Sequence, residues 1–531
     1  MVVVEIEKSD LLNLVGQSLS DDDLEDLLFK LKCEATISGE NIICEINPDR
    51  LDMVSVEGIA RAMKGYLGLP LKKYELQDSK LSLSGESQLR PAFLAAVIEG
   101  VEMSDQLVKS LMQIQEKLHA TLGRNRAKVA IGVHDLDKIK GPVEYMDADA
   151  VETSFIPLQD SRTMNLNEIL EKHPKGKDYA HLLTGNKYPV FFDKEGPISF
   201  PPIINSERTK VTEHTKNLFV DITGTDKKAV EQALNILLCN VAERMGTLKT
   251  VRINREKIPK LEEKTIMIEK EEPNKILGLE LDEAGIKRCL DRMLYTVGIK
   301  GGRIIINVPV YRADILNNAD IIEDVAIGYG YNNMEAVLPN LATIGSLSKK
   351  EILTRKVREI MIGEGFQEFL NFVLTNKENN FDKMSTSGQC VEILNPVSSE
   401  YSSLRTWLAP SLMKSLAANM HVEYPQKIFE VGDIVDLDTV PVRKLAGAVS
   451  HDNANLTEVK SLVESVLREI GLKYDIKSFK HPSFIDTRCG EIFIQGKAIG
   501  YFGEVHTRVL ENWKLERPVI IFEISLEGLY G

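Results

Sequence analysis

The chain has 531 residues, more than a single hydrophobic core usually holds, so we expect three or four domains. Hydrophobic residues make up 43% of the sequence and charged residues 27%, which is ordinary for a soluble globular protein. No apolar run is long enough to span a membrane, and the net charge of −14 argues against a protein coated in nucleic acid.

Residues 1–75 are predicted to form a small α/β module. The N-terminus reads as a strand running into a helix and lacks the features of a signal peptide, so we expect a cytoplasmic protein with no membrane contact. Ser20 is expected to cap a helix, and a second helix is expected from Val56 to about Lys64. The Ser-rich stretch 76–85 has the composition of a linker.

Cysteines are scattered over the chain, without a CxxC pair or a histidine at zinc spacing. We expect them to be buried free thiols in a reducing cytosol. They are Cys33, Cys44, Cys239, Cys289, Cys390 and Cys489.

Strands and helices alternate over residues 86–264. A strand is predicted at Asn217–Ile222, followed by a helix whose apolar periodicity stops at Gly246. The acidic balance of the chain leaves room for a local basic groove, because three cations fall within five residues: Arg124, Arg126 and Lys128.

Residues 265–340 read as two helical stretches, a strand at Arg303–Pro309 and an acidic segment. Beyond a connector, Ser348 and Glu351 have capping-box spacing and predict a long helix that ends near Gly363. Strands are then predicted at Phe369–Leu374, Lys427–Ile434, Glu491–Gln495, Ala498–Glu504 and Val519–Leu526.

The acidic segment is the most distinctive pattern in the chain. Asp320, Glu323 and Asp324 share one helical turn, and Asp314 precedes them by six residues. The segment 311–333 has one Arg against these four acids, so a divalent cation such as Mg²⁺ would relieve their repulsion. Spacing alone equally fits a solvated acidic face near a helix N-terminus.

The sequence YRADILNNADIIEDVAIGYGYNN, at Tyr311–Asn333, resembles the B5 motif of the phenylalanyl-tRNA synthetase β-subunit family. The resemblance implies that Asp314, Asp320, Glu323 and Asp324 bind Mg²⁺ shared with the α subunit. Asn317–Ala319 departs from the His-Pro-Val type stretch of many relatives without touching a ligand. Further similar segments follow in the family's order: Ile46–Gly68, Gly123–Pro142, Phe200–Asp226, Ile393–Met420 and Lys427–Val435.

The resemblance implies a multidomain α+β protein of the short archaeal and eukaryotic type. Residues 1–75 would form a B1-like module, 86–264 a B3/B4 editing domain, 265–340 a small B5 domain, and 345–531 a class II synthetase-like antiparallel sheet with helices. It also implies an α2β2 complex with the α subunit, which acts on tRNA(Phe). The helix after Ser348 is our candidate for part of the α-facing surface.

The C-terminal domain is expected to be catalytically degenerate. A class II core needs two Arg residues on ATP, and Arg405 is a conceivable remnant of the first. No Gly-rich helix start with the second Arg occurs near the C-terminus, where a strand is predicted instead. We therefore expect the phenylalanine-tRNA ligase reaction on the α subunit.

The resemblance places hydrolytic editing of Tyr-tRNA(Phe) in the B3/B4 region. The candidate pocket residues are Val190, Ser199, Asp221 and Thr223. Asp221 and Thr223 face the same way along a strand end, although strand-end and cap roles would equally explain them. Glu207 and His214 are less secure candidates. No metal-ligand cluster lies nearby, so we expect metal-free hydrolysis.

His134 and Asp135 are neighbours in a predicted strand and would point to opposite faces, so we expect a structural role for His134. Two rival functions remain open for the whole chain. One is a free-standing aminoacyl-tRNA deacylase, and the other is a non-enzymatic RNA-binding scaffold.

Overall fold

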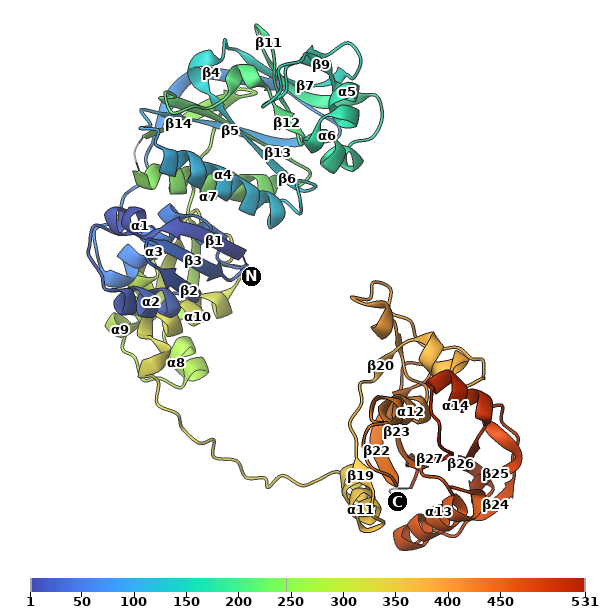
Figure 1. The fold of residues 1–531 in the computed structure, drawn as a ribbon. Coiled ribbons are helices and arrows are strands. Elements are labelled where there is room, and N and C mark those ends of the chain that lie inside the picture. The colour runs from blue at the N-terminus through green and yellow to red at the C-terminus, as the bar shows by residue number, and fades with distance from the viewer. Residues whose placement is uncertain (1, 245, 530–531) are drawn as a thin grey trace. The chain divides into compact units, whose positions relative to one another are not determined.

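The computed structural model describes residues 2–244 and 246–529, which belong to two compact units, Met1–Val337 and Leu338–Gly531 (Figure 1). Each unit combines β-sheets with helices, so the predicted multidomain α+β class is confirmed. None of the helices in the described part of the chain has both the length and the apolar run that a bilayer crossing needs. The six cysteines are buried free thiols, as predicted.

A three-stranded antiparallel sheet, ordered β1-β3-β2, forms the N-terminal module. Alternate residues of β1 are buried, because successive side chains of a strand face opposite ways. The Ser20 side chain caps the second helix by accepting a hydrogen bond from the Asp23 amide at 3.2 Å, as predicted. The elements are β1 (Val2–Glu7), α1 (Lys8–Val15), α2 (Asp21–Lys30), β2 (Cys33–Ser38), β3 (Asn41–Ile46) and α3 (Val56–Leu67).

A ten-stranded sheet dominates the middle region, ordered β12-β11-β10-β7-β4-β14-β5-β13-β6 with β15 beside β14. Helices α4 and α7 pack on one face through a shared apolar core (Figure 1). The strands are β4 (Leu76–Gly85), β5 (Ala92–Glu99), β6 (Val129–Asp135), β7 (Val143–Asp149), β10 (Lys187–Asp193), β11 (Gly196–Phe200), β12 (Ile204–Asn205), β13 (Asn217–Gly224), β14 (Thr247–Ile253) and β15 (Glu256–Ile258). The other elements are α4 (Asp105–Ala120), β8 (Ser154–Phe155), β9 (Met164–Asn165), α5 (Leu166–Lys172), α6 (Pro174–Tyr179) and α7 (Lys227–Arg244).

The linker predicted at residues 76–85 is wrong, because this stretch is β4 and pairs in parallel with both β14 and β7. Its leucines alternate with serines, and Leu83 is buried while the serines on either side are exposed or half-buried. A strand with one covered face needs few apolar residues, since its neighbours supply the backbone hydrogen bonds.

Another three-stranded antiparallel sheet, ordered β16-β18-β17, completes the first unit with three helices. The strand predicted at Arg303–Pro309 is confirmed as β18, whereas β16 and β17 were not predicted. The elements are β16 (Lys264–Glu269), α8 (Glu271–Leu277), α9 (Glu283–Arg292), β17 (Thr296–Lys300), β18 (Arg303–Val308) and α10 (Asn318–Tyr329).

The second unit is built on a seven-stranded sheet, ordered β19-β22-β23-β27-β26-β25-β24, in which only the β19–β22 pairing is parallel among the described strands. The structure confirms the predicted long helix and the predicted C-terminal strand. The strands predicted at Glu491–Gln495 and Ala498–Glu504 pair with one another as a hairpin. The strands are β19 (Gln367–Glu368), β20 (Leu374–Thr375), β21 (Ser403–Leu404), β22 (Gln426–Val435), β23 (Pro441–Ser450), β24 (Asp475–Ser478), β25 (Phe484–Ile494), β26 (Lys497–Val505) and β27 (Val519–Ser525). The helices are α11 (Lys349–Gly363), α12 (Ala409–Ala418), α13 (Leu456–Ile470) and α14 (Thr507–Trp513).

The strand predicted at Phe369–Leu374 is wrong over most of its length. Leu370 and Phe372 are 88% and 74% exposed, so their apolar side chains are not buried in this unit. The backbone amide of Asn371 donates to the side chain of Glu430 at 3.4 Å rather than to a neighbouring strand. Alternating apolar residues indicated a strand here, although no sheet face covers them.

Candidate functional site

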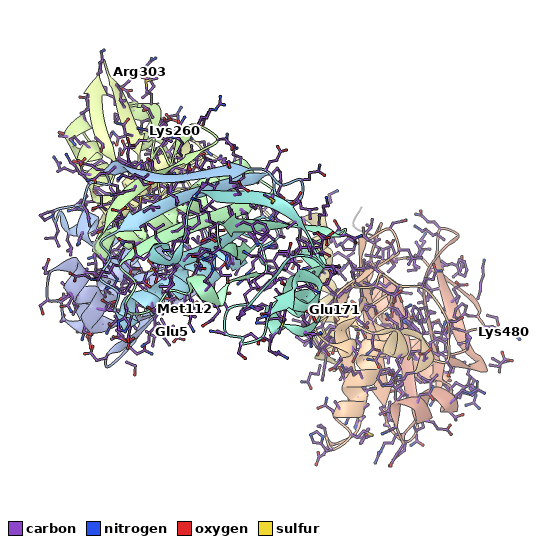
Figure 2. All side chains as sticks on the ribbon, turned by 90° about the horizontal axis from the view of Figure 1, so that it is seen from above. Glu5, Met112, Glu171, Lys260, Arg303 and Lys480 are labelled. Carbon is purple, nitrogen blue, oxygen red and sulfur yellow. The ribbon has the colours of Figure 1, made fainter. Side chains whose placement is uncertain are left out.

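A pocket of about 530 Å³ lies beside β6, the strand at one end of the ten-stranded sheet. Its walls come from β6, helix α4 and the segment 199–211. Met112 of α4 lies on its exposed side, with 58% of the residue accessible (Figure 2). This volume suits a ligand of amino-acid size or somewhat larger. Apolar lining residues include Leu111, Met112, Ile131, Val133, Phe200 and Ile203.

Side chains, rather than another strand, bond to the outer backbone edge of β6. His119 Nε2 accepts from the Ile131 amide at 2.8 Å, and the Gln115 side-chain amide donates to the Ile131 carbonyl at 3.3 Å. The Asn205 side-chain amide donates to the Val133 carbonyl, also at 3.3 Å. The pocket therefore follows a strand edge that polar side chains cover.

A buried chain of hydrogen bonds lies in the pocket wall. His134 Nε2 lies 2.7 Å from Asp221 Oδ2, and His134 Nδ1 lies 2.8 Å from Thr209 Oγ1. Both ring nitrogens of His134 therefore have a hydrogen-bonding partner, a carboxylate on one side and a hydroxyl on the other. This arrangement fixes the orientation of both the imidazole and the carboxylate.

The register of two strands creates the His134–Asp221 pair. His134 lies opposite Phe219 and Gly132 lies opposite Asp221, so the two side chains are diagonal neighbours on one face. A glycine is required at position 132, because a Cβ there would collide with the Asp221 carboxylate. Asp135, the sequence neighbour of His134, bonds to Thr215 instead, at 3.0 Å.

Two of the four predicted editing residues line this pocket, namely Ser199 and Asp221. Ser199 Oγ lies 3.2 Å from Asn205 Oδ1. Thr223 and Val190 lie outside the described lining of the pocket. The Thr223 hydroxyl accepts from Arg90 Nε at 3.1 Å, and Val190 of β10 is fully buried in an apolar core.

The two less secure candidates also lie elsewhere. Glu207 accepts from the Gln159 backbone amide at 2.7 Å, and the His214 side chain is 88% exposed. Sequence reasoning missed the contact between His134 and Asp221, because the two residues are 87 positions apart in the chain and meet across a strand pairing. It also missed His119, which lines the pocket together with Arg126, a residue predicted only as part of a local basic groove.

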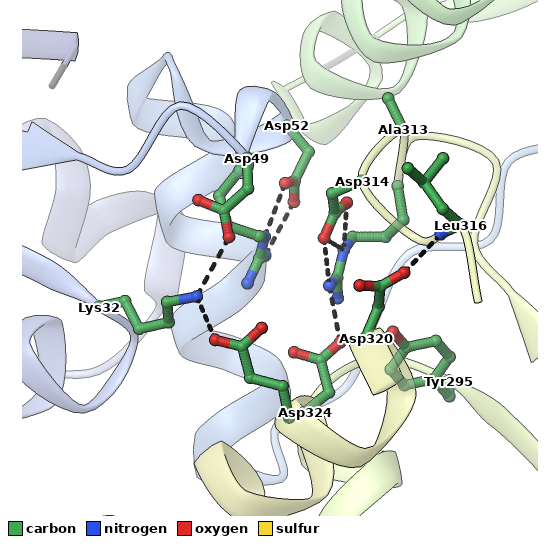
Figure 3. A network of polar contacts seen from close by, with 12 residues as sticks. Lys32, Asp49, Asp52, Tyr295, Ala313, Asp314, Leu316, Asp320 and Asp324 are labelled. Carbon is green, nitrogen blue, oxygen red and sulfur yellow. Dashed lines mark hydrogen bonds and ion pairs between the residues drawn. The ribbon is translucent and has the colours of Figure 1, made fainter. Parts of the chain in front are cut away.

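The acidic segment leads into α10, and each of its acids bonds to another group of the chain (Figure 3). Asp320 completes a capping box, accepting from the Leu316 and Asn317 amides at 2.7 and 2.8 Å. Glu323 pairs with Lys32 of the N-terminal module at 2.7 Å.

Arg312 lies between the other two acids, 2.7 Å from Asp314 and 2.6 Å from Asp324. Tyr295 also donates to Asp324. Burial alone would lower the pKa of Arg312, but these two carboxylates keep that pKa well above its usual value. Arg312 and Lys32 therefore balance the charges of three acids of this segment, for which the segment itself contains only one Arg.

No group of three or more His, Cys, Asp or Glu side chains is arranged to hold a metal ion in the part of the chain that the structure describes. The four acids bind a helix terminus, Lys32 and Arg312, and in this arrangement they do not form a ligand cage. Binding of a Mg²⁺ ion by all four acids would require them to exchange these partners.

Arg405, the conceivable ATP-binding remnant, is buried in the second unit. It pairs with Glu430 at 2.7 Å and donates from Nε to the Asp433 carbonyl at 3.0 Å. With 2% of the residue exposed, this guanidinium holds two segments of the fold together and does not face a ligand.

Comparisons with known proteins agree along the chain. Family profiles match the B3/4 domain at residues 91–244, the tRNA synthetase B5 domain at 266–331, and the phenylalanyl tRNA synthetase beta chain CLM domain at 334–526. A solved N-terminal fragment of the phenylalanyl-tRNA synthetase beta-subunit from Pyrococcus horikoshii is 38% identical, with a TM-score of 0.59. The match covers 62% of this chain and 99% of that fragment.

Full-length relatives are equally consistent. The phenylalanine–tRNA ligase beta subunit of Methanocaldococcus jannaschii is 41% identical over 548 residues, covering 99% of this chain and 100% of that protein. The beta subunit of Archaeoglobus fulgidus is 40% identical, covering 100% of this chain and 99% of that protein. The three domains and the end-to-end similarity lead to one conclusion: the chain belongs to the phenylalanyl-tRNA synthetase beta-subunit family.

Proposed function

We propose that the pocket beside β6 hydrolyses misacylated tRNA, specifically Tyr-tRNA(Phe), within a phenylalanine–tRNA ligase. One observation carries the proposal: a pocket of about 530 Å³ has in its lining the carboxylate of Asp221, which the buried His134 holds from behind. The volume accommodates an aromatic amino acid, and Asp221 supplies a fixed polar group beside apolar side chains of the lining.

Chemistry explains why such a site is needed. A pocket that binds phenylalanine excludes tyrosine poorly, since in a hydrophobic site an added hydroxyl lowers kcat/KM only by a factor of about 10². A second site that recognises the hydroxyl and hydrolyses the ester restores accuracy. A buried carboxylate suits this recognition, because phenylalanine leaves it without a partner.

Asp221 and His134 would divide the work. His134 holds Asp221 through Oδ2, so Oδ1 can accept a hydrogen bond from the tyrosine hydroxyl or from the attacking water. The Ser199 hydroxyl, held near Asn205, offers a second polar contact. Hydrolysis would proceed without a metal ion, with the water positioned by these groups and by the substrate.

Deacylation of Tyr-tRNA(Phe) tests the proposal. Asp221→Ala should slow hydrolysis by about 10²-fold, the usual effect of losing a positioned acid–base or recognition group, while Ser199→Ala should have a smaller effect. Glu171→Gln removes an exposed charge on α5 outside the pocket (Figure 2) and is the matched control. Hydrolysis that is unchanged in Asp221→Ala would rule out this pocket.

We propose further that the chain pairs with an α subunit in an α2β2 complex that acts on tRNA(Phe). The relatives are named beta subunits, and the second unit exposes large apolar side chains that suit a protein partner. They include Ile352 and Ile362 on α11, together with Leu370, Phe372, Leu394 and Val397. Co-purification with a co-expressed α subunit should fail when these residues are replaced in groups by serine.

Aminoacylation would belong to the α subunit, because Arg405 is buried against Glu430. The complex should catalyse phenylalanine-dependent ATP–pyrophosphate exchange, and this chain alone should not. Exchange by the isolated chain would contradict this assignment. Full deacylation without the α subunit would favour a free-standing deacylase, and no deacylation in either form would favour an RNA-binding scaffold.

Mg²⁺ binding at the acidic segment remains a separate proposal, with Asp314, Asp320, Glu323 and Asp324 as ligands. Its support is the sequence motif, and against it stand the ion pairs of Arg312 and Lys32. Titration calorimetry of the complex with Mg²⁺ should give heat that is lost in Asp320→Ala/Glu323→Ala. Equal heat from both proteins would rule these ligands out.

A further inference from the structure

The far end of the pocket holds a positively charged corner that editing chemistry at Asp221 leaves unexplained. Arg126 stacks on the ring of Tyr179 at 4.5 Å, and its Nη1 donates to the Pro202 and Ile203 carbonyls at 3.2 and 2.9 Å. Lys175 also lines this pocket. Arg126 is 8% exposed, so its position is fixed by the fold.

Two hydrogen-bond donors in this corner lack acceptors. The Nε atom of Arg126 and the Nδ1 atom of His119 are buried and have no hydrogen-bond partner in the described part of the chain. His119 Nε2 accepts from the Ile131 amide, which places the proton on Nδ1, and burial lowers the pKa of His119 and keeps the ring neutral. Buried donors without acceptors are costly, so a ligand that brings an acceptor into this corner would be stabilised there.

Glu116 shows what kind of group fits this corner. Its Oε1 atom lies 3.0 Å from Arg126 Nη2 and 4.0 Å from His119 Nδ1. Nearby His119 and the charge of Arg126 lower the pKa of Glu116 to about 2. The Glu116 side chain is nevertheless 55% exposed, so it can swing into solvent at little cost. A surface carboxylate thus occupies a place suited to an anionic oxygen.

The side chains of the corner and those beside Ser199 are held by neighbouring positions of β6. Ile131 anchors His119, and Val133 anchors Asn205 beside Ser199. These two β6 residues are two positions apart, or about 7 Å along a strand, a spacing that one ribose can bridge.

We propose that Arg126 and His119 form a phosphate subsite for the 3′-terminal nucleotide of the acylated tRNA, and that Glu116 occupies it when no tRNA is bound. The proposal rests on the editing function proposed above. Phosphate binding displaces Glu116 and gives Arg126 and His119 the acceptors that they lack. Glu116 therefore competes with tRNA and keeps the empty site electrically balanced.

Binding of two hydrolysis-resistant probes tests the subsite. The probes are 3′-tyrosylamino-3′-deoxyadenosine with and without a 5′-phosphate, titrated into the full-length chain in complex with its α subunit. The phosphate should tighten binding by about tenfold, the size expected for charge-assisted hydrogen bonds. Added salt should reduce this advantage.

Variants make the test specific. The ratio of the two probe affinities measures the phosphate advantage. Glu116→Gln removes the competing charge from a half-exposed side chain and should increase this ratio by about threefold or more, while Glu171→Gln should leave it unchanged. Arg126→Lys keeps the charge but loses Nε and should narrow the advantage. Inorganic phosphate should compete with the phosphorylated probe only.

Two outcomes would overturn the subsite. Equal affinity for the two probes would contradict it while leaving the editing pocket intact. An unchanged phosphate advantage in Glu116→Gln would contradict the role of Glu116. If neither probe binds the unchanged protein, the editing function and the subsite are both contradicted.

Discussion

At the residue scale, the pocket depends on a pairing that chain order conceals. Asp221 was singled out by the family resemblance, but its partner His134 was assigned a structural role. Each interpretation considered neighbours along the chain, whereas the relevant neighbours lie across β6 and β13. Thr223 shares a face with Asp221 and bonds to Arg90, outside the described lining of the pocket.

Gly132 gives a residue-scale prediction. In Gly132→Ala the new Cβ would meet the Asp221 carboxylate and come within 3.0 Å of His134 Nε2. We expect a loss of stability of about 1–3 kcal/mol, as for other overpacked sites, together with slower Tyr-tRNA(Phe) deacylation. Urea unfolding and deacylation assays measure the two effects.

Gly298→Ala is the control, because nothing lies within 4 Å of a Cβ at that position in β17. It should match the unchanged protein in both assays. Normal deacylation by Gly132→Ala would show that the Asp221–His134 geometry is unimportant.

Asp52 gives a second residue-scale prediction, on pH. Burial alone would raise the pKa of Asp52, but Arg50, 2.8 Å away, lowers that pKa to about 2. Since the pKa is lower in the folded state, the stabilising contribution is present above the ordinary value of about 4 and is lost as the pH falls towards 2. Unfolding free energy should therefore decrease over this interval.

Asp52→Asn should reduce that pH dependence and cost about 3–5 kcal/mol at pH 7, because it leaves the Arg50 charge buried and uncompensated. Glu25→Gln, an exposed change on α2, should cost far less. Urea titrations at pH 7, 4 and 3 compare the three proteins. An Asp52→Asn protein as stable as the unchanged chain would contradict this account.

At the element scale, α10 shows how far a motif predicts geometry. Sequence correctly places Asp320, Glu323 and Asp324 on one helix, and it correctly predicts the N-terminal acids that a helix favours. The sequence of the segment could not show that Lys32 of the N-terminal module pairs with Glu323. It therefore predicted charge repulsion in a cluster whose charges are partly balanced by cations. The same limit hid β4, whose identity depends on β14 and β7.

Substitutions at the start of α10 distinguish a structural role of its acids from a role in binding a metal ion. Asp320→Ala should lower stability by about 1 kcal/mol, because two backbone amides lose their acceptor. Glu323→Ala breaks a partly exposed ion pair and should cost less. The loss that comes from the cap should persist in EDTA, and binding of Mg²⁺ by these acids should add a further loss that is seen only in Mg²⁺. A loss that disappears in EDTA would indicate a bound metal ion.

At the scale of the whole molecule, two units are joined by a connector. Residues 334–348, all of them described, contain no helix or strand, and Leu338, Leu341 and Ile344 are 92%, 71% and 98% exposed. Composition predicted a connector near these residues, and the order of domains also followed from local motifs. The sequence could not predict which apolar side chains stay uncovered, because that depends on the packing of each unit.

Limited proteolysis tests the connector. A protease that prefers apolar side chains should cleave first between residues 337 and 345 and yield two fragments that match the two units. Replacing Leu338, Leu341 and Ile344 by serine should slow this cleavage, and added α subunit should slow it if the segment lies in the complex interface. First cleavage within either unit would contradict the division.

The covered edge of β6 has a consequence for self-association. An exposed strand edge invites pairing with another copy, and here His119, Gln115 and Asn205 satisfy that edge with side chains. The polar walls of the pocket thereby protect the chain against edge-to-edge aggregation. Substitutions that enlarge or empty the pocket consequently risk lowering solubility, so loss of soluble protein must be separated from loss of activity.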